Sequence, residues 1–579
     1  MTRARDIADQ HKTLSIDGGT IKLDGNFPTG TENVALGNQA LDDGSLSGGA
    51  NTAIGNNALS DNEGGANNTA VGRNALGSNT SANSNTAVGY NALVLNTTGE
   101  SNVAIGFGAL DANTTGAESV AVGIDAGGAN TTGRITAVGR HAVKSNTTAV
   151  ENTGIGYRAL RDTTTGPNNT AVGGDALLLN TTGDTNVAVG KDSMKANTTG
   201  TNNTALGPRT LESNTTAVNN VAVGDLALGD NTTGNSNVAI GVSALDANTT
   251  ASENFAGGFN ALGANTTGAS NVGIGHRALQ SNTTASENVA VGFEAMKNNT
   301  TGTPNSAFGR QAMFTNTTGG SNNAFGEQAM YANTTGSFNV AMGNLALDAN
   351  TTADSNTAVG YSAGSAVTTG GDNTFVGQRA GLAVTTGTNN TFIGRGVADG
   401  AGAKITTGSK NTIIGGFHGN QDGVDIRTET NQVVLSDGDG QVRLLFDSNG
   451  NMRAPYVYNG NTSSTAANVF IGSTGYFGRS TSSRRYKNTI TDATHGLTEL
   501  LTLRPITYKG NNDGDTVFGG LIAEDVHDAG LSEFVIYDDD NEPDALAYGN
   551  MVSLCIKAIQ ELKTELDAAK ARIATLEAE

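Results

Sequence analysis

The sequence predicts an all-β repeat rod, a parallel β-solenoid or β-roll with 17-residue coils, followed by a small α+β domain that ends in a coiled coil. Three observations lead to this prediction. A short pattern recurs at a nearly constant period. Its side chains are small, with 80 Gly and no Trp among 579 residues. The charge density then rises abruptly near residue 482. Small side chains cannot fill several thick cores, but they can fill one long thin core.

The repeat reads N-[TV]-A-[VI]-G-x-x-A-L-x-x-N-T-T-G-x-x. Its first glycine, called here the coil glycine, occurs 23 times from Gly37 to Gly415, and 19 of the 22 spacings are 17 residues. The other three spacings are 18, 16 and 21 residues. Such a period is too short for a propeller blade or a helical pair, and it suits one narrow coil. Stacked at ~4.8 Å per coil, residues 33–415 predict a rod on the order of 110 Å long.

Each repeat is predicted to contain two short extended stretches joined by turns. The N-T-A-V-G half alternates like a strand, with Ala on one face and its two neighbours on the other. The second half, A-L-x-x-N-T-T-G, carries one bulky side chain and ends in a glycine turn. That bulky residue is expected either in the core of the coil or at a seam between chains; examples are Leu93, Leu110, Met313 and Met330.

Asparagine recurs at two positions of the repeat. It stands four residues before the coil glycine in 21 of 23 repeats, Ser119 and Ile135 being the exceptions. A second Asn stands seven residues after the coil glycine, as at Asn96 and Asn113. Two interpretations remain open, because stacked amides form ladders along a strand-stacking axis and because Asn favours turns.

Residues 416–481 are predicted to be a β-rich transition, because D-G and N-G pairs typical of hairpins separate short apolar runs. Aromatic side chains gather there, either in a core or for contact with a saccharide or a protein: Phe417, Tyr456, Tyr458, Phe470, Tyr476 and Phe477.

Residues 482–579 form a separate predicted domain. They contain 9 Lys/Arg and 18 Asp/Glu in 98 residues, a far higher charge density than the 24 and 36 in the preceding 481. A heptad seam runs through residues 550–579: Val552, Cys555, Ile559, Leu562, Leu566, Ala569, Ile573 and Leu576. About four heptads of this kind favour self-association through a coiled coil. On that seam, Cys555 is interpreted as a small hydrophobic residue rather than a nucleophile.

Several classes of function are disfavoured by composition. A single cysteine and six scattered histidines give no spacing for a metal site, and no cofactor motif is present. The net charge of −21 argues against nucleic-acid binding. No run of about 18 apolar residues predicts a membrane span. The first residues, MTRARDIADQHK, lack the apolar stretch of a secretory signal.

The N-T-A-V-G and N-V-A-I-G signature of residues 33–415 resembles the head repeats of trimeric autotransporter adhesins. The resemblance implies a trimer of left-handed parallel β-rolls. The period here is longer than the one usual in that family.

The C-terminal segments occur in a characteristic order: S-S-R-R-Y-K-N-T-I, LTELLTLRPITYKG, FGGLIAEDVHDAGLSEFVIYDDD and ALAYGNMVSLCIKAIQELKTEL. This order resembles the intramolecular chaperone of endosialidase-type phage tailspikes and tail fibres. The resemblance implies a homotrimer whose chaperone helps the β-structured rod assemble and then cleaves itself off. It maps the cleaving pair onto Ser482 and Lys487, and the scissile bond onto Thr481–Ser482.

The residues themselves are compatible with that chemistry. A serine hydroxyl needs a base, and a lysine can act as one when its pKa falls. Arg484 and Arg485 would favour the neutral amine of Lys487 by repulsion of like charges. The alternative is a solvated Ser-rich loop whose basic residues pair with the acidic domain.

The expected function is that of a phage tail fibre, a homotrimer made in the host cytoplasm and carried on the virion. Residues 1–32 would bind a tail or baseplate protein, and the rod would adhere to a host polysaccharide or outer-membrane protein. One alternative is a tailspike depolymerase, which would need two carboxylates ~5–10 Å apart. The acidic residues of the rod, expected on a solvated face, are the candidates: Asp111, Glu212, Asp246 and Asp348. Another alternative is a purely structural fibre that carries a separate receptor-binding protein.

Overall fold

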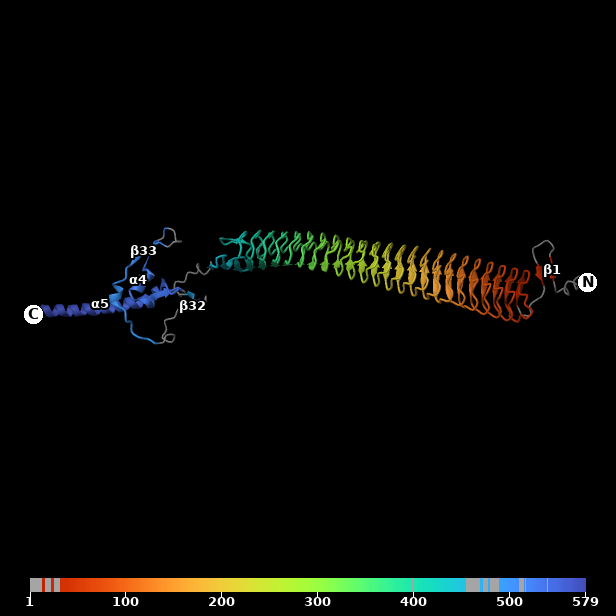
Figure 1. Ribbon diagram of the computed structural model, residues 1–579, viewed down its shortest axis with the longest axis horizontal. Helices are drawn as coiled ribbons and strands as arrows, with labels where there is room; N and C mark the ends of the chain where they lie inside the picture. The colour runs from red at the N-terminus through yellow and green to blue at the C-terminus, as the bar shows by residue number, and fades with distance from the viewer. Residues whose placement is uncertain are drawn as a thin grey trace, which may run out of the picture. The chain divides into compact units, whose positions relative to one another are not determined.

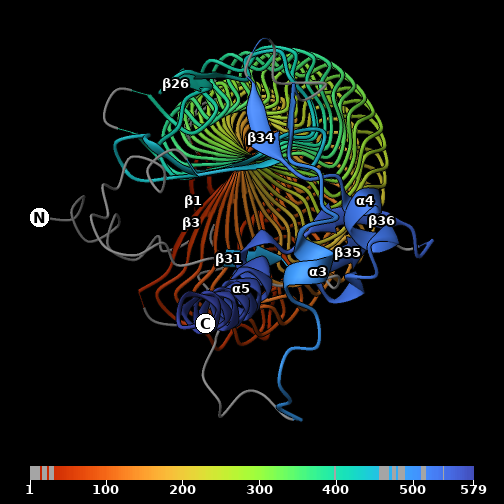
Figure 2. The same ribbon diagram turned by 90° about the vertical axis from the view of Figure 1, so that its left-hand side faces the viewer.

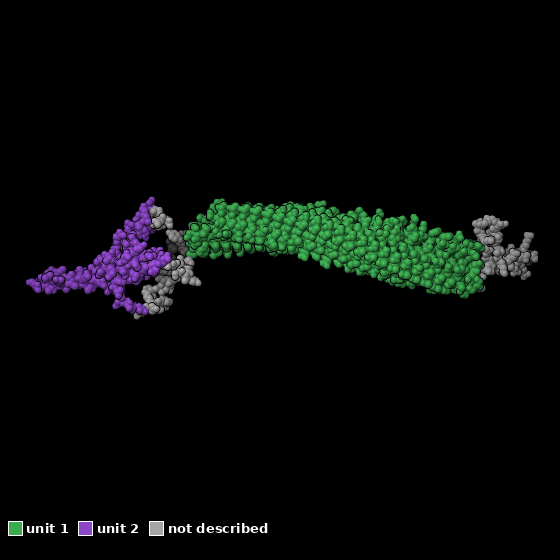
Figure 3. All heavy atoms as spheres, viewed as in Figure 1, with its two compact units in different colours: residues 1–460 green, residues 461–579 purple. Residues whose placement is uncertain are grey.

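The computed structural model describes residues 13–15, 22–24, 32–396, 399–454, 469–471, 477–479, 489–509, 515, 517–538 and 540–579. The chain divides into two compact units, Met1–Gly460 and Asn461–Glu579 (Figure 3). Each unit is described by itself below.

The first unit is a β-solenoid in which each repeat forms one coil (Figure 1). Twenty-three strands, one per coil glycine, pair in sequence order and in parallel from β3 to β25. The strands are β3 Val34–Leu36, β4 Thr52–Ile54, β5 Thr69–Val71, β6 Thr86–Val88, β7 Val103–Ile105, β8 Val120–Val122, β9 Ile135–Val138, β10 Asn152–Ile155, β11 Thr170–Val172, β12 Val187–Val189, β13 Thr204–Leu206, β14 Val221–Val223, β15 Val238–Ile240, β16 Phe255–Gly257, β17 Val272–Ile274, β18 Val289–Val291, β19 Asn305–Phe308, β20 Asn322–Phe325, β21 Val340–Met342, β22 Thr357–Val359, β23 Thr374–Val376, β24 Thr391–Ile393 and β25 Thr412–Ile414. The predicted solenoid with 17-residue coils is therefore confirmed.

The register places equivalent residues of successive coils side by side. Ala87 pairs with Ala104, and Ala104 with Ala121. The coil glycine is required at its position, because it has φ between 115° and 144°. A Cβ on Gly106 would also lie 2.3 Å from the carbonyl oxygen of Gly123 in the next coil. No other residue type fits both the backbone conformation and the spacing of the coils.

The second half of the coil differs from the prediction, because it forms consecutive turns and not a second strand. The residues two and four after the coil glycine have positive φ, as at Asn91 (57°) and Leu93 (52°), and this conformation interrupts an extended chain. The turns still bond along the rod. Leu93 N donates to Ala109 O at 3.0 Å, and Thr97 N donates to Thr114 O at 2.8 Å. Hydrogen bonds between coils therefore run around most of the circumference.

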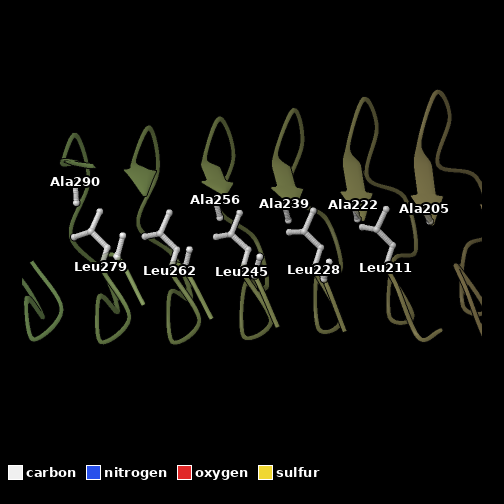
Figure 4. Close-up of a cluster of buried hydrophobic side chains, with 14 of the residues drawn as sticks. Ala205, Leu211, Ala222, Leu228, Ala239, Leu245, Ala256, Leu262, Leu279 and Ala290 are labelled. Carbon is white, nitrogen blue, oxygen red and sulfur yellow. The ribbon is translucent and has the colours of Figure 1, made fainter. Parts of the chain in front are cut away.

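The core of the solenoid lies inside each coil of the single chain. The bulky residue of each turn points toward the strand Ala of the following coil, as Leu245 does toward Ala256 (Figure 4). Both side chains are fully buried, and so are Leu93, Leu110, Met313 and Met330. Of the two places expected for the bulky residue, the structure thus selects the coil core.

Both positions of recurrent Asn form ladders of buried amides. In one ladder, Asn113 Nδ2 donates to Asn96 Oδ1 of the previous coil at 2.9 Å and to Gly116 O at 3.0 Å. In the other, Asn102 N donates to Asn85 Oδ1 at 2.9 Å. Asn113 thus both continues a ladder and closes its own turn, so both interpretations of the sequence hold at that position. At the other position, Asn102 Nδ2 donates to Gly116 O, 14 residues away, at 2.9 Å, so there the ladder accompanies a bond across the coil.

The predicted hairpins follow the last coil. Strand β28 (Val433–Ser436) pairs in parallel with β25 and antiparallel with β29 (Val442–Phe446), which pairs with β30 (Met452–Arg453). A small hairpin of β26 (Asn420–Gln421) and β27 (Val424–Asp425) precedes them. Phe417 is fully buried; the side chains of the other five aromatic residues singled out in this region lie outside the described part. Near the N-terminus, β1 (Thr13–Ser15) pairs with β2 (Lys22–Asp24).

The second unit is a small α+β domain. Three antiparallel pairs are formed by β31 (Val469–Ile471) with β32 (Phe477–Arg479), β33 (Ile506–Tyr508) with β34 (Phe518–Gly520), and β35 (Val535–Tyr537) with β36 (Pro543–Leu546). The helices are α3 (Leu497–Leu500), α4 (Ala523–Asp528), the 3-10 turn η2 (Ser532–Phe534) and the long α5 (Tyr548–Glu577). Its buried core is small: Val526, Leu531, Phe534, Val535, Met551 and Leu554.

Candidate interaction surfaces

The strands of the solenoid turn two of their three side chains outward. These are the residues one and three positions before each coil glycine in β3–β25, and we call this surface the outer sheet face. The position directly before the coil glycine is a large apolar residue in 22 of 23 coils, Gly257 being the exception. The position three before it is never charged, and it is Val or Thr in 20 of 23 coils. Ile240 remains 46% exposed and Met342 47% exposed.

The outer sheet face winds around the rod. Seen along its length, successive coils are rotated relative to one another, so that their outlines fan out (Figure 2). Charged side chains lie at other positions of the coil and pair between coils. Arg158 Nε lies 2.7 Å from Asp175 Oδ1, and Arg310 Nη1 lies 2.8 Å from Glu327 Oε1. The row directly before the coil glycines is therefore apolar from coil to coil, with a gap at Gly257, while these ion pairs lie at other positions of the coil.

Aromatic rings stack along the rod in the position directly after the coil glycine. The His276 ring lies between those of Phe259 and Phe293, with centroids 5.3 Å and 5.1 Å apart and nearly parallel planes. Phe308 and Phe325, on the outer sheet face, stack at 4.8 Å. Because the ring faces cover one another, their outer edges face solvent. A sugar ring that binds by stacking needs an open aromatic face, so these ladders favour coil-to-coil stabilisation over saccharide stacking.

Helix α5 has one buried side and one exposed apolar side. Met551, Leu554 and Ala558 are buried against the second unit. The heptad seam faces solvent along most of the helix, with exposed fractions of 64% at Ile559 and 65% at Leu576. The predicted seam therefore lies on a real helix and has no partner within the described part of the chain. Cys555, on this seam, is exposed.

The second unit exposes further apolar side chains. Leu501 is 74% exposed and Val517 is 59% exposed, and Tyr548 and Ile556 are also exposed. A six-residue core beside so much exposed apolar surface is typical of a domain that completes itself by association.

The predicted cleavage site lies outside the part of the chain that the structure describes. This holds for Thr481, Ser482 and Lys487, and also for Arg484 and Arg485. Their proposed roles stay predictions from the sequence.

The acidic residues of the rod are less solvated than expected. Four of them stand five residues after a coil glycine and are partly buried: Asp111, Glu212, Asp246 and Asp348. Burial raises the pKa values of Asp111, Asp246 and Asp348 above the usual range of Asp. For Asp246, the nearby Asp230 raises the pKa further, while Arg209 opposes that shift. Glu212 and Asp246 stand two coils apart, about 10 Å along the rod, so they are the one pair in this set with a spacing near that of a glycosidase.

Among the described residues, no helix is both long enough and apolar enough to cross a membrane, and no group of three or more His, Cys, Asp or Glu side chains is arranged to hold a metal ion. Comparisons with protein-family models, curated proteins and solved structures found no match.

Proposed function

We propose that the chain is a homotrimeric phage tail fibre that adheres to the host cell surface. The observation that carries the proposal is the exposed heptad seam of α5, which belongs to the same chain as a solenoid of more than twenty coils. A repeat rod supplies reach, and a seam of this kind supplies the means to join copies at one end. In this proposal the virion holds the fibre through residues 1–32, and the rod meets a surface polysaccharide or an outer-membrane protein.

The C-terminal unit has a specific task in the proposal. Uniform coils of different chains can pair one coil out of register at little local cost. Association of the C-terminal units first would align the chains before the rods meet. Self-cleavage at Thr481–Ser482 by Ser482 and Lys487 would then release the guide.

The first experiment measures the molar mass of the purified full chain by light scattering and of its polypeptide by mass spectrometry. The proposal expects three copies of the 58.5 kDa chain, or three shortened chains if cleavage occurs before Ser482. A monomer would contradict the homotrimer. A trimer of intact polypeptides would contradict the self-cleavage but not the homotrimer.

The second experiment tests adhesion and separates it from the depolymerase alternative. The labelled full chain is incubated with a panel of bacteria and with their capsule and lipopolysaccharide. Binding without new reducing ends supports the adhesin. New reducing ends that disappear in Glu212→Gln and Asp246→Asn variants support the depolymerase, for which the spacing of these two carboxylates is the favouring observation. No binding to any strain would support a structural fibre with a separate receptor-binding protein.

A further inference from the structure

We propose that the outer sheet face is the surface through which copies of this chain pack against one another along the rod, parallel and coil against coil. The inference rests on the self-association in the proposed function, and it adds the surface, the orientation and the register. Nothing in the fold of one chain needs this face, because the coil core is complete on the other side of the strands.

The first argument compares two exposed positions of the same repeat. The position directly after the coil glycine is exposed and accepts any chemistry, from Phe107 and Tyr157 to Arg140, Lys191 and Glu327. The position directly before the coil glycine is comparably exposed at Ile240 and Met342, yet it is never polar in 23 coils. Solvent exposure alone permits charge at both positions. A requirement for apolar contact explains why only one of them excludes it.

The second argument is the size of the outer sheet face. A single apolar patch on a monomer rarely exceeds a few hundred Å². If each coil leaves on the order of 100 Å² of this face open, 23 coils present roughly 2,000 Å², the size class of obligate interfaces. Such an area is too large to leave in water in a stable soluble fibre.

The third argument identifies the occupant. A compact globular partner would cover a few coils and leave the rest of the outer sheet face open. A second copy has the same length and the same axial spacing, so its own outer sheet face covers the whole length. In the proposed homotrimer, three-fold symmetry makes the three α5 helices run parallel, and the rods of the three copies then run parallel as well. Since the face winds around each rod, the copies must wind around one another.

The experiment uses the full chain with its only cysteine replaced, Cys555→Ala, and with one new cysteine. Ile105→Cys lies on the outer sheet face, and Thr115→Cys is the matched control, exposed in the coil nearby but outside the face. Ile105 is far from the middle of the rod, so antiparallel copies would not bring it near its equivalent. Each variant is treated with a short bis-maleimide and run on a denaturing gel, and its reaction with a bulky maleimide is timed separately.

The inference expects Ile105→Cys to cross-link copies in high yield and to react with the bulky reagent at least tenfold more slowly than Thr115→Cys. Equal reactivity of the two thiols, or cross-linking at Thr115→Cys instead, would overturn it and would indicate a free face or another occupant. If light scattering still shows an oligomer in that case, only the inference fails and association through α5 survives. If the Cys555→Ala parent and the wild type are both monomeric, the inference and the proposed homotrimer fail together.

Discussion

At the scale of single residues, a larger side chain at one core position of the solenoid is matched by a smaller one at the position that packs against it. In the last coils, the bulky residue of the turn is replaced by Gly364, Gly381 and Gly402, all with φ near +60°. The strand Ala is replaced there by Phe375 and Phe392, which are fully buried. A Cβ on Gly364 would lie 2.7 Å from Phe375 Cδ2, so the phenyl ring occupies the space that Leu fills elsewhere.

This exchange predicts the outcome of a double-mutant cycle at Phe375 and Gly364. Phe375→Ala is expected to cost about 3–5 kcal/mol of unfolding free energy, because it leaves a cavity. Gly364→Leu alone is expected to cost ~1–3 kcal/mol through overpacking. The double variant restores the pattern of the other coils and should be more stable than Phe375→Ala, as urea unfolding can measure. If the double variant loses as much unfolding free energy as the two single variants together, the Phe375 ring does not fill the space that Leu fills in the other coils.

The half-buried carboxylate of Asp348 predicts a pH dependence. Its Oδ1 is buried without a hydrogen-bond partner among the described residues, and burial is the main cause of its raised pKa. A raised pKa in the folded state means that folding favours the protonated form. This contribution to stability is fully present below the unfolded pKa of 3.8, and it is lost as the pH rises from there through the higher folded pKa.

Asp348→Asn should accordingly raise the melting temperature at pH 7, because the amide is neutral and avoids the cost of burying a carboxylate. The gain should vanish below the unfolded pKa of 3.8, where both forms are neutral. Asp372→Asn, at an exposed position of the next coil, is the control and should change little. A stabilisation by Asp348→Asn that persists unchanged at pH 3 would refute this cause.

At the scale of elements, strands and turns differ in how far the sequence predicts them. The strand half was predictable because alternation puts Ala inward and its neighbours outward. The prediction of a second extended stretch in the turn half was wrong, because the positive φ values fall on Leu and Met, and these residues rarely adopt such values. The Ser119 and Ile135 exceptions had no sequence explanation. In the structure, Ser119 Oγ continues the ladder by bonding Gly133 O at 3.1 Å, and Ile135 fills space beside Gly127, where Leu is missing.

Of the surfaces, only those formed by residue types that recur at a regular spacing could be predicted from the sequence. The heptad of α5 can be read directly, whereas the small core of the second unit depends on contacts between distant segments that no short motif encodes. The winding of the outer sheet face depends on small rotations between coils, which leave no trace in the spacing of the glycines.

Helix α5 offers a prediction at this scale, because two leucines on it have opposite environments. Leu562 is 52% exposed on the heptad seam, and Leu554 is 1% exposed in the core. Leu562→Glu should leave the helical circular dichroism of the second unit intact and lower the molar mass seen by light scattering. Leu554→Glu should unfold the unit, because it buries a charge. Thr564→Glu, exposed but off the seam, is the control. Unchanged assembly in Leu562→Glu would exclude the seam as a contact.

At the scale of the whole molecule, the solenoid is modular because each coil contacts mainly the coils before and after it. The 16-residue and 18-residue spacings show that single-residue changes can be absorbed within a turn. Each core and ladder residue, however, must lie beside its equivalent in the neighbouring coil, as Ala87 lies beside Ala104.

Removal of residues 225–241, one full coil between two coil glycines, should therefore preserve the fold and shorten the rod by ~4.8 Å. Removal of nine residues from the same region should disrupt it, because Ala would then meet a turn rather than another Ala. Circular dichroism, thermal unfolding and small-angle scattering of the full chain distinguish the outcomes. Equal stability of the two deletions would contradict a core maintained by coil register.

The direction of the backbone hydrogen bonds has a mechanical consequence. In a solenoid these bonds join one coil to the next, so they point along the rod, and a pull on its ends loads every rung in series. Hydrogen bonds loaded in this way break one coil at a time. Each unfolded coil of 17 residues lengthens the chain by roughly 50 Å. The rod would then yield in equal steps under tension, absorbing work at each step while the unbroken coils keep their shape.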